Sequence, residues 1–253
     1  RNVIAWFAKR GIHQPTLAAF RIKSGRAWMH GPNGGGECQT IQFPFYLDGQ
    51  VVNVKYRTSD KRFRQEKGAR KCLYNVDMAM KAGGDRLIIT EGEMDCLALY
   101  EAGFRAVVSV PDGAPSPDAK TYASKFDFLH GMEELFEKFR WVVLAVDNDA
   151  PGKKLEEELS RRIGLDKCLR VFWPNGCKDA NDVLVNYGPE DLNKCIHAAA
   201  FFPVDGVKTV GDLWSDVFAL HGQPEQPGAD IGWPSAVGVF NVEPGQMTVV
   251  TGV

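Results

Sequence analysis

The sequence lacks several features that would fix its location or its chemistry. It contains no run of about 18 apolar residues, so we expect no membrane-spanning helix and no membrane partner. Its 6 cysteines form no Cys-x-x-Cys pair and fit no zinc framework, so we expect reduced, structural thiols. Its 5 histidines have no Ser or Cys partner in a pattern typical of a catalytic triad.

The first residues lack an initiator Met and the layout of a signal peptide, so we expect a segment of a longer protein. The length of 253 residues and a hydrophobic content of 44% are ordinary for a soluble protein. A chain of this length buries a sufficient core without disulfides.

The net charge of −2 conceals a strong asymmetry. Residues 1–71 carry 14 Lys/Arg and 4 Asp/Glu, a net +10, whereas residues 72–253 carry 16 and 28, a net −12. A basic segment followed by an acidic one indicates an anionic polymer bound by the first and cations bound by the second. The alternative is an uneven but solvated surface.

Residues 1–82 have the pattern of a small basic α+β lobe. Short helices are expected at 5–8 and 15–20, followed by alternating strands at 27–29, 40–45 and 51–57. Asp48-Gly49 between the last two strands predicts a tight hairpin turn.

Residues 83–200 instead follow a strand–helix rhythm. Apolar strands are expected at 87–90, 106–110, 141–146 and 169–173, with helices at 94–102, about 119–139, 152–164 and about 189–200. Such a pattern predicts an α/β fold, a parallel sheet covered by helices on both faces with right-handed crossovers. Residues 201–235 read as a helical linker with a helix at 210–221, and residues 236–253 as the start of another domain, with a strand at 247–250.

Acidic residues follow two of these strands where a parallel sheet binds its ligands. Glu91 and Asp95 come after the strand at 87–90, and Asp147 and Asp149 come after the strand at 141–146. Carboxylates gathered in one crevice repel one another unless a cation neutralises them. Oxygen ligands of this kind suit Mg²⁺ or Mn²⁺.

A simpler interpretation is that these acids cap helices. Glu93 and Asp95 at a helix N-terminus are favourable without any metal. Two acidic clusters at the same edge of one sheet favour the metal site over separate caps.

The acidic set resembles a known domain. Glu91-Gly92, Asp95 and the run from Asp147 through Asp149 to Gly152 are similar to the Toprim domain of topoisomerases, DnaG-type primases, recombination mediators and some nucleases. The resemblance implies that Glu91 is the general acid/base and that Asp147 and Asp149 are metal ligands, with Asp95 beside them.

The flanking segments resemble the primase half of phage primase–helicases and Twinkle. The similar segments are residues 5–17, 54–65, 178–182 and 242–252, the last of which is similar to the strand before a RecA-type helicase P-loop. No Gly-Lys-Ser/Thr motif follows, so helicase activity is not expected of this chain. No cysteine zinc module precedes the basic lobe, so the template-recognition part of phage primases is not expected in it either.

The resemblance implies a DNA primase, a nucleotidyltransferase that makes short RNA primers on a single-stranded DNA template from nucleoside triphosphates. Divalent cations would be held by Glu91, Asp95, Asp147, Asp149 and Asp182. Triphosphate oxygens would be bound by Lys55, Arg57, Lys61, Arg64 and, more weakly, Lys178.

Two other functions stay open: a Toprim nuclease, and a catalytically silent module that binds single-stranded DNA and docks a neighbouring subunit through the helix at 210–221. The resemblance also implies a RecA-type helicase domain and a hexamer in the parent protein. The expected location is the cytoplasm of a phage-infected or prophage-carrying bacterium, or an organelle matrix if the parent is Twinkle-like. Base stacking is conceivable for four aromatic residues for which core packing is favoured: Trp28, Phe43, Phe45 and Tyr56.

Overall fold

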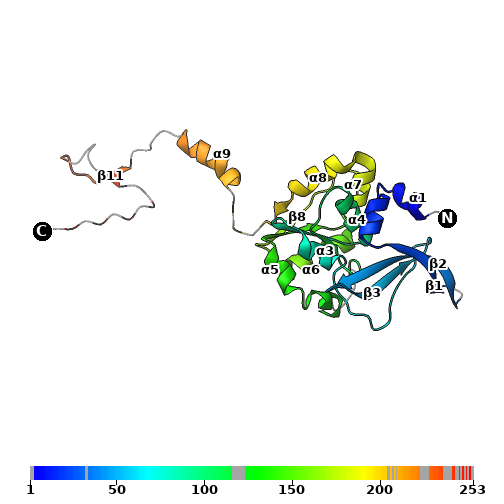
Figure 1. Ribbon diagram of the computed structural model, residues 1–253. Helices are drawn as coiled ribbons and strands as arrows, with labels where there is room; N and C mark the ends of the chain where they lie inside the picture. Colours follow the sequence, from blue (N-terminus) through cyan, green and yellow to red (C-terminus); the bar gives the residue numbers. More distant parts are fainter. Residues whose placement is uncertain are drawn as a thin grey trace. The chain divides into compact units, whose positions relative to one another are not determined.

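The computed structural model describes residues 3–31, 34–115 and 123–203 without gaps, and beyond them residues 206, 208, 210–222, 228–235, 241–242, 245, 247, 249 and 251. Contacts divide the chain into two units, residues 1–202 and 203–253. The first unit contains both the predicted basic lobe and the predicted parallel sheet (Figure 1).

The basic lobe begins with two short helices, α1 (Val3–Ala8) and α2 (Gln14–Ala19). An antiparallel sheet of order β1-β2-β3-β4 follows. Its strands are β1 (Lys23–Gly31), β2 (Gly34–Leu47), β3 (Gln50–Arg57) and β4 (Phe63–Gln65). The helices and first three strands were predicted, and β4 was not, because three residues are too short to show alternation.

The β2–β3 turn has the predicted chemistry. Asp48 and Gly49 both have positive φ, 54° and 77°, which is the geometry of a type I′ hairpin turn. Their backbone N–H groups donate to the two carboxylate oxygens of Asp77 at 2.9 and 2.8 Å. Asp77 lies in α3 (Val76–Lys81), so this turn also joins the lobe to the α/β part.

Aromatic residues of the lobe differ in their role. Core packing is confirmed for Phe43 and Phe45, which are 1% and 0% exposed and contact the buried ring of Tyr74. For Trp28 the core prediction is wrong, because its side chain is 47% exposed. Tyr56 is half-buried under the guanidinium of Arg64.

The second sheet has the order β6-β5-β7-β8-β9. Its parallel strands are β5 (Arg86–Thr90), β6 (Val107–Ser109), β7 (Trp141–Ala145) and β8 (Cys168–Arg170). A short antiparallel strand, β9 (Ala200–Phe201), closes one edge. The parallel α/β sheet is thus confirmed. The fourth strand is shorter than predicted, since it ends at Arg170 rather than Trp173.

Crossover handedness explains where the helices lie. The chain moves from β5 to β6 in one direction, and then from β6 past β5 to β7 and on to β8 in the other. Right-handed crossovers therefore require α4 (Glu93–Glu101) on one face, with α5 (Glu133–Lys138) and α6 (Ala150–Ile163) on the opposite face. Figure 1 shows this arrangement, with α7 (Ala180–Tyr187) and α8 (Pro189–His197) on the side of α4. A 3₁₀ helix, η1 (Ala123–Leu129), precedes α5.

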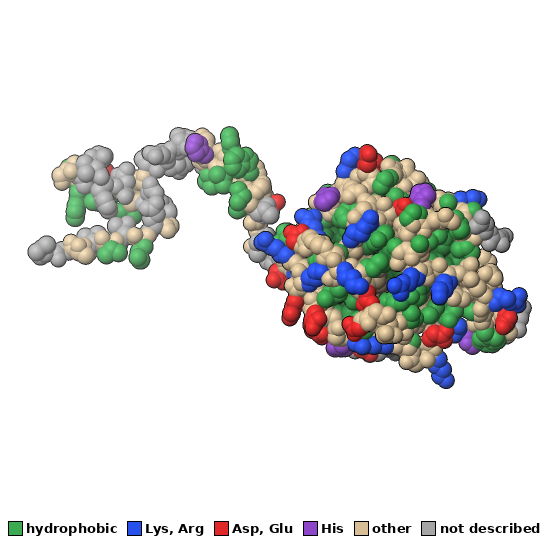
Figure 2. Space-filling view, in the orientation of Figure 1, with side chains coloured by type: hydrophobic (Ala, Val, Ile, Leu, Met, Phe, Trp, Pro, Cys, Tyr) green, Lys and Arg blue, Asp and Glu red, His purple; other side chains and the backbone are tan. Residues whose placement is uncertain are grey.

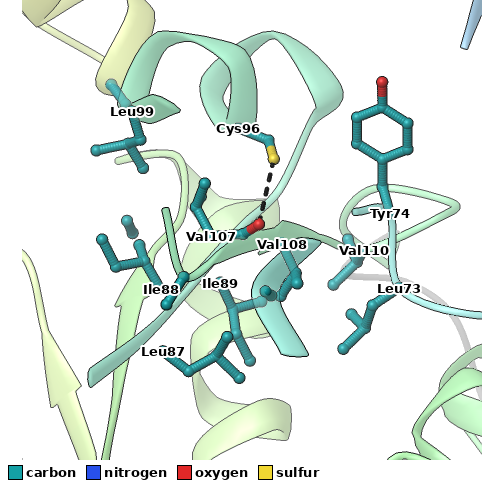
Figure 3. Packing of buried hydrophobic residues seen from close by; sticks show 14 of the residues in the cluster. Leu73, Tyr74, Leu87, Ile88, Ile89, Cys96, Leu99, Val107, Val108 and Val110 are labelled. Carbon is teal, nitrogen blue, oxygen red and sulfur yellow. Dashed lines mark hydrogen bonds between the residues drawn. The ribbon is translucent and has the colours of Figure 1, made fainter. Parts of the chain in front are cut away.

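The core between β5, β6 and α4 holds the sheet in place. Figure 3 shows Leu87, Ile88 and Ile89 of β5 beside Val107 and Val108 of β6, all at most 3% exposed. Continuous apolar strands of this kind are required where both faces of a sheet are covered. Burial of these side chains fixes the ends of β5 and β7, from which the acidic residues emerge.

The second unit contains α9 (Val210–His221), as predicted, and a short ribbon of β10 (Ala229–Asp230) and β11 (Asn241–Val242). Figure 2 shows apolar side chains on the surface of α9. The exposed ones are Val210, Leu213, Trp214, Val217, Phe218 and Leu220. The strand predicted at 247–250 includes positions outside the described residues. Among the described residues, no helix is long and apolar enough to cross a membrane.

Candidate active site

The strand order places the two acidic clusters side by side. β5 pairs with β7, and Thr90 lies opposite Ala145 at their carboxyl ends. The strand that follows β5 in the chain, β6, lies on one side of β5, and the next strand, β7, lies on the other side. The crevice between β5 and β7 is therefore the switch point at which such sheets bind ligands. The acids that follow Thr90 and Ala145 therefore enter one crevice, as predicted.

A cleft of about 960 Å³ opens above this edge. The basic lobe forms one wall, mainly through β3, β4 and the segment after β4, and the acidic edge forms the other. From the predicted site, the cleft is lined by Lys55, Arg57, Lys61, Arg64, Glu91, Asp95, Asp147 and Lys178. Asp149 and Asp182 do not line it.

Three carboxylates in the crevice are close enough to share a cation. Asp95, Asp147 and Asp179 each offer an oxygen, and these oxygens lie within 4.8 Å of one another. Burial raises the pKa of all three, and the neighbouring carboxylates raise it further. Raised pKa values mean that the ionised cluster is poorly neutralised by the protein itself.

Sequence reasoning placed Asp182 in this cluster and missed Asp179. The carboxylate of Asp179 caps α7 by accepting from the N–H of Asp182 at 2.8 Å, and it faces Asp95 and Asp147. The carboxylate of Asp182 turns back and accepts from the N–H of Lys178 at 3.0 Å. An acid followed by a helical stretch is an N-cap signal, which would have identified α7 and Asp179.

Lys178 lies across the acids that follow β7. Its Nζ is 2.8 Å from Asp147 and 2.9 Å from Asp149, and these contacts raise the Lys178 pKa. Asp149 also accepts from the N–H of Gly152 at 2.9 Å as the cap of α6. Burial raises the Asp149 pKa, but these two donors outweigh it and lower it overall. Asp149 is thus satisfied within the protein, whereas Asp95 and Asp179 have no ion pair in the described part of the chain.

Glu91 is the acid suited to proton transfer. Burial and the nearby charge of Asp147 raise its pKa to about 7. Its Oε1 accepts from the N–H of Ala114 at 3.2 Å, in the loop after β6. Its Oε2 is buried and has no hydrogen-bond partner among the residues that the structure describes. An acid whose pKa lies near neutrality serves as a general base or acid at physiological pH.

These residues fit a divalent cation such as Mg²⁺ or Mn²⁺. The donors are carboxylate oxygens, which such ions prefer, and the buried, unpaired Oε2 of Glu91 leaves a further acceptor beside them. Asp95, Asp147 and Asp179 would hold the ion. In the described residues, Lys178 is the cation paired with this group of acids, and it reaches Asp147 but leaves Asp95 and Asp179 without a counterion.

Lys55, which was predicted to bind triphosphate oxygens, has two partners within the protein. Its Nζ is buried, 2.8 Å from Glu93 and 2.9 Å from the carbonyl oxygen of Pro111. A second contact between the walls is made by Asp112, which binds Lys71 at 2.8 Å and Gln65 at 2.6 Å. These contacts fix the basic lobe against the sheet and set the width of the cleft.

The other predicted cations are more open to a ligand. Arg57 lies over the rings of Trp6 and Phe63, at 4.8 and 5.7 Å, and its Nε has no hydrogen-bond partner among the described residues. Burial and nearby Arg10 lower its pKa. Arg64 lies over Tyr56 at 4.2 Å and reaches Glu66 at 3.4 Å. Lys61 is exposed at the rim, and Figure 2 shows Lys and Arg side chains spread over one face of this unit.

Comparison with known families decides what the α/β part is. The sequence profile described as the Toprim domain matches residues 85–171. Residues 85–171 are a Toprim domain. This match covers β5 to β8 and includes four predicted acids: Glu91, Asp95, Asp147 and Asp149. Asp179 lies just beyond it.

Relatives of the whole chain share more than this domain. The chain is 35% identical to the Twinkle homolog protein, chloroplastic/mitochondrial, of Arabidopsis thaliana across 98% of this chain and 35% of the relative. It is 36% identical to the primase homolog protein of the same plant across 79% of this chain and 59% of the relative. It is 31% identical to the DNA helicase/primase of Enterobacteria phage T3 across 53% of this chain and 22% of the relative. The predicted resemblance is confirmed, although the chain spans less than two thirds of each relative.

Solved structures show the same fold. The primase fragment of the bacteriophage T7 primase-helicase aligns with a TM-score of 0.59 over 75% of this chain and 72% of its own, at 24% identity. The Aquifex aeolicus primase, with its zinc binding and RNA polymerase domains, aligns with a TM-score of 0.64 over 80% of this chain and 57% of its own, at 15% identity. Both alignments cover more of this chain than the Toprim domain at residues 85–171 alone.

Proposed function

We propose that this chain is the primase part of a primase–helicase and makes short RNA primers on single-stranded DNA. The observation that carries the proposal is the cleft itself: Asp95 and Asp147 line one wall, and Arg57 and Arg64 line the other. Asp179 lies beside these two acids, close enough to share a cation with them. A nucleoside triphosphate with a bound divalent cation carries the charges that both walls lack. The primase names of the relatives support the same activity.

The chemistry is attack of a nucleotide 3′-hydroxyl oxygen on the α-phosphorus, with departure of pyrophosphate. A bound divalent cation would lower the pKa of that hydroxyl and neutralise charge on the leaving group. Glu91 takes up the proton at Oε2, the buried oxygen without a partner. Its pKa of about 7 lets it accept a proton and release it again near neutral pH.

Arg57, Lys61 and Arg64 hold the triphosphate. A guanidinium offers paired N–H donors to phosphate oxygens, and the aromatic rings under Arg57 and Arg64 keep both groups oriented without using those donors. Lys55 acts indirectly, since its ion pair with Glu93 fixes the strand that carries Arg57. Lys178 neutralises Asp147 and Asp149 and is free to contact phosphate when a cation takes its place.

The proposed partners are a single-stranded DNA template and nucleoside triphosphates, with a RecA-type helicase domain and a hexamer in the parent protein. The likeness to a chloroplastic/mitochondrial protein over 98% of this chain favours an organelle matrix as the place of action. A phage-infected bacterial cytoplasm is the alternative that the phage T3 relative supports.

A primer-synthesis assay tests the proposal. The protein is incubated with single-stranded DNA, labelled ribonucleotides and Mg²⁺ or Mn²⁺, and the products are separated by length. We expect short RNA from the wild type and at least a hundredfold less from Asp147→Ala, because the variant removes a carboxylate shared by the cation cluster and Lys178.

The matched control is Asp191→Ala, which removes an Asp on the surface of α8 that pairs with Lys194 away from the cleft. This variant should synthesise RNA at the wild-type rate. Cleavage of the DNA in place of RNA synthesis would indicate a nuclease. DNA binding without either product would indicate a silent module, and equal synthesis by Asp147→Ala and wild type would remove the proposed site.

A further inference from the structure

Trp28 has an exposed indole at a position where core packing does not account for a large aromatic side chain. It lies in β1, and 47% of its surface is open to solvent, whereas its neighbour Met29 is 1% exposed on the other face of the strand. The cleft does not use it, since Trp28 lies outside the residues that line it. Burial therefore does not explain the indole at this position.

The sheet register shows which way Trp28 faces. Alternate residues of a strand share a face, so Trp28 lies on the same face of β1 as Ser24. Ser24 is opposite Ile41, and Ile41 is opposite Arg57. Directly opposed residues also share a face. Trp28 is thus on the cleft side of the sheet, farther out along the β1–β2 hairpin than Arg57.

The hairpin is shaped to hold the indole there. A Cβ on Gly35 would come within 1.8 Å of the six-membered ring of Trp28, so the ring occupies the space of a missing side chain. The imidazole of His30 contacts the indole edge-to-face, with 4.5 Å between ring centroids. Both neighbours limit the rotation of Trp28, which keeps its ring in a defined place on an open surface.

Positive charge connects Trp28 to the cleft. Arg62 donates to the carbonyl oxygen of His30 at 2.7 Å, which joins the β3–β4 turn to the hairpin. Lys61, in the same turn, is exposed and lines the cleft. Glu37, the acid opposite Trp28, is neutralised by Arg26 at 3.1 Å. A polyanion leaving the cleft would pass the Lys61 ammonium before it reaches the indole.

We propose that Trp28 is a stacking site for a base of single-stranded DNA where the strand runs from the cleft onto the β1–β2 hairpin. Proteins that hold single strands without reading their sequence combine aromatic rings, on which bases stack, with positive charge along the backbone. Here Trp28 supplies the ring, and Lys61 and the basic wall of the cleft supply the charge. This inference rests on the proposed function for the identity of the strand. It adds a binding site outside the cleft, and the site makes no contribution to the chemistry.

Binding of fluorescent oligothymidylates to the full chain tests it. With a strand of about 16 nucleotides, Trp28→Ala should weaken binding roughly tenfold, within the range that one base stack contributes. A strand of about 4 nucleotides, short enough to stay in the cleft, should bind both proteins alike. Trp28→Phe should retain most of the affinity, because a phenyl ring still stacks.

Two controls separate stacking from other roles. A strand of abasic spacers should bind wild type and Trp28→Ala equally, because it has phosphates but no bases. Tyr187→Ala removes another half-exposed aromatic side chain, on α7, and should leave DNA affinity unchanged.

Equal affinity of Trp28→Ala and wild type for the long strand, with or without a fall in melting temperature, would overturn the inference and leave Trp28 as a hairpin-packing residue. If Trp28→Ala lost affinity for oligouridylate but not for oligothymidylate, the inference would also be overturned, because the strand bound at Trp28 would then be RNA. This binding assay does not depend on primer synthesis. If the wild type made no RNA but its DNA affinity still fell in Trp28→Ala, the proposed primase function would be refuted and the stacking site would be retained.

Discussion

The charged residues of the basic lobe and those at the acidic edge of the Toprim domain have opposite kinds of surroundings. In the lobe, Arg57 and Arg64 lie on aromatic rings that orient the guanidinium groups and leave N–H donors for a ligand. At the sheet edge, burial and mutual repulsion raise the pKa of Asp95 and Asp179. Among the described residues, the basic wall has cations that are not paired with anions, and the acidic wall has carboxylates that are not paired with cations. The width of the cleft keeps the two sets of charges from pairing with each other. A ligand that contains both phosphate and a divalent cation can neutralise both walls, because its phosphate oxygens bind the basic wall and its cation binds the carboxylates.

The architecture behind each wall also differs. In the antiparallel sheet of the lobe, alternate side chains of β3 (Asn53, Lys55 and Arg57) line the cleft, whereas Val54 and Tyr56 do not. The parallel sheet is covered on both faces and exposes chemistry at its carboxyl edge. Contacts at Lys55 and Asp112 join the two, and breaking them is the most direct way to test whether the walls act together.

The largest effect on stability is expected at Lys55. Lys55→Met leaves the buried carboxylate of Glu93 without its counterion, and loss of one partner of a buried ion pair costs about 3–5 kcal/mol. Urea unfolding should show a fall of this size in the free energy of unfolding. Lys61→Met, at the exposed rim, is the matched control and should change stability by less than about 0.5 kcal/mol.

The double variant Lys55→Met, Glu93→Gln separates the two functions proposed for Lys55. If Lys55 acts through Glu93, the neutral pair should recover much of the lost stability and of the nucleotide KM. Recovery of stability with a KM still raised would show that Lys55 contacts the triphosphate directly, as the sequence predicted.

A smaller effect is expected at Lys178. Lys178→Met removes the ammonium that neutralises Asp147 and Asp149, so the metal-free protein should lose about 1 kcal/mol, a modest amount because Lys178 is 51% exposed. The same change removes a cation that competes at Asp147. Calorimetry should therefore show tighter Mn²⁺ binding, and unchanged or weaker binding would show that Lys178 supports the metal site.

The smallest effect concerns the contact between α2 and α4. Glu101 accepts from the N–H of His13 at 3.1 Å and from the hydroxyl of Thr16 at 2.5 Å. Burial raises the Glu101 pKa, but these hydrogen bonds outweigh it and lower it overall. A lowered carboxyl pKa stabilises the fold above the pKa of the unfolded chain, and this stability is lost as pH falls through the folded pKa.

Glu101→Gln should thus cost about 0.5 kcal/mol near pH 6, and the difference from wild type should shrink as the pH is lowered to about 3. Thermal unfolding at both pH values measures it. A difference that stays constant over this range would mean that the charge of Glu101 contributes nothing to the contact.

Local patterns were sufficient to predict the fold. Strand periodicity found β5 to β8 and most of the lobe, and Asp48-Gly49 found the hairpin turn, because these features depend on neighbouring residues alone. The meeting of the two acidic clusters in one crevice was predicted from the acids that follow two of the strands. Among the elements of the first unit, α3, β4, α7 and β9 were missed. The two strands are too short to show a period, and α7 begins inside a segment that was interpreted as ligands alone.

Side-chain partners were harder to predict. Nothing near Lys55 in the sequence shows that its ammonium is buried against Glu93, 38 residues away. Asp179 and Asp182 both follow the fourth strand, and the local geometry of the α7 cap decides which one faces Asp95. Exposure of Trp28 depends on Gly35, its diagonal neighbour on the next strand. Each of these depends on how distant segments pack.

The central claim is that Asp95, Asp147 and Asp179 bind a divalent cation because, among the described residues, Lys178 pairs with Asp147 alone of the three and leaves Asp95 and Asp179 without a counterion. Electron paramagnetic resonance of Mn²⁺ measures this directly in the absence of nucleotide and DNA. The account predicts a bound ion in the wild type and in Asp191→Asn, and affinity at least tenfold weaker in Asp95→Asn and Asp147→Asn. Free Mn²⁺ at every protein concentration, or equal affinity in all four proteins, would contradict it.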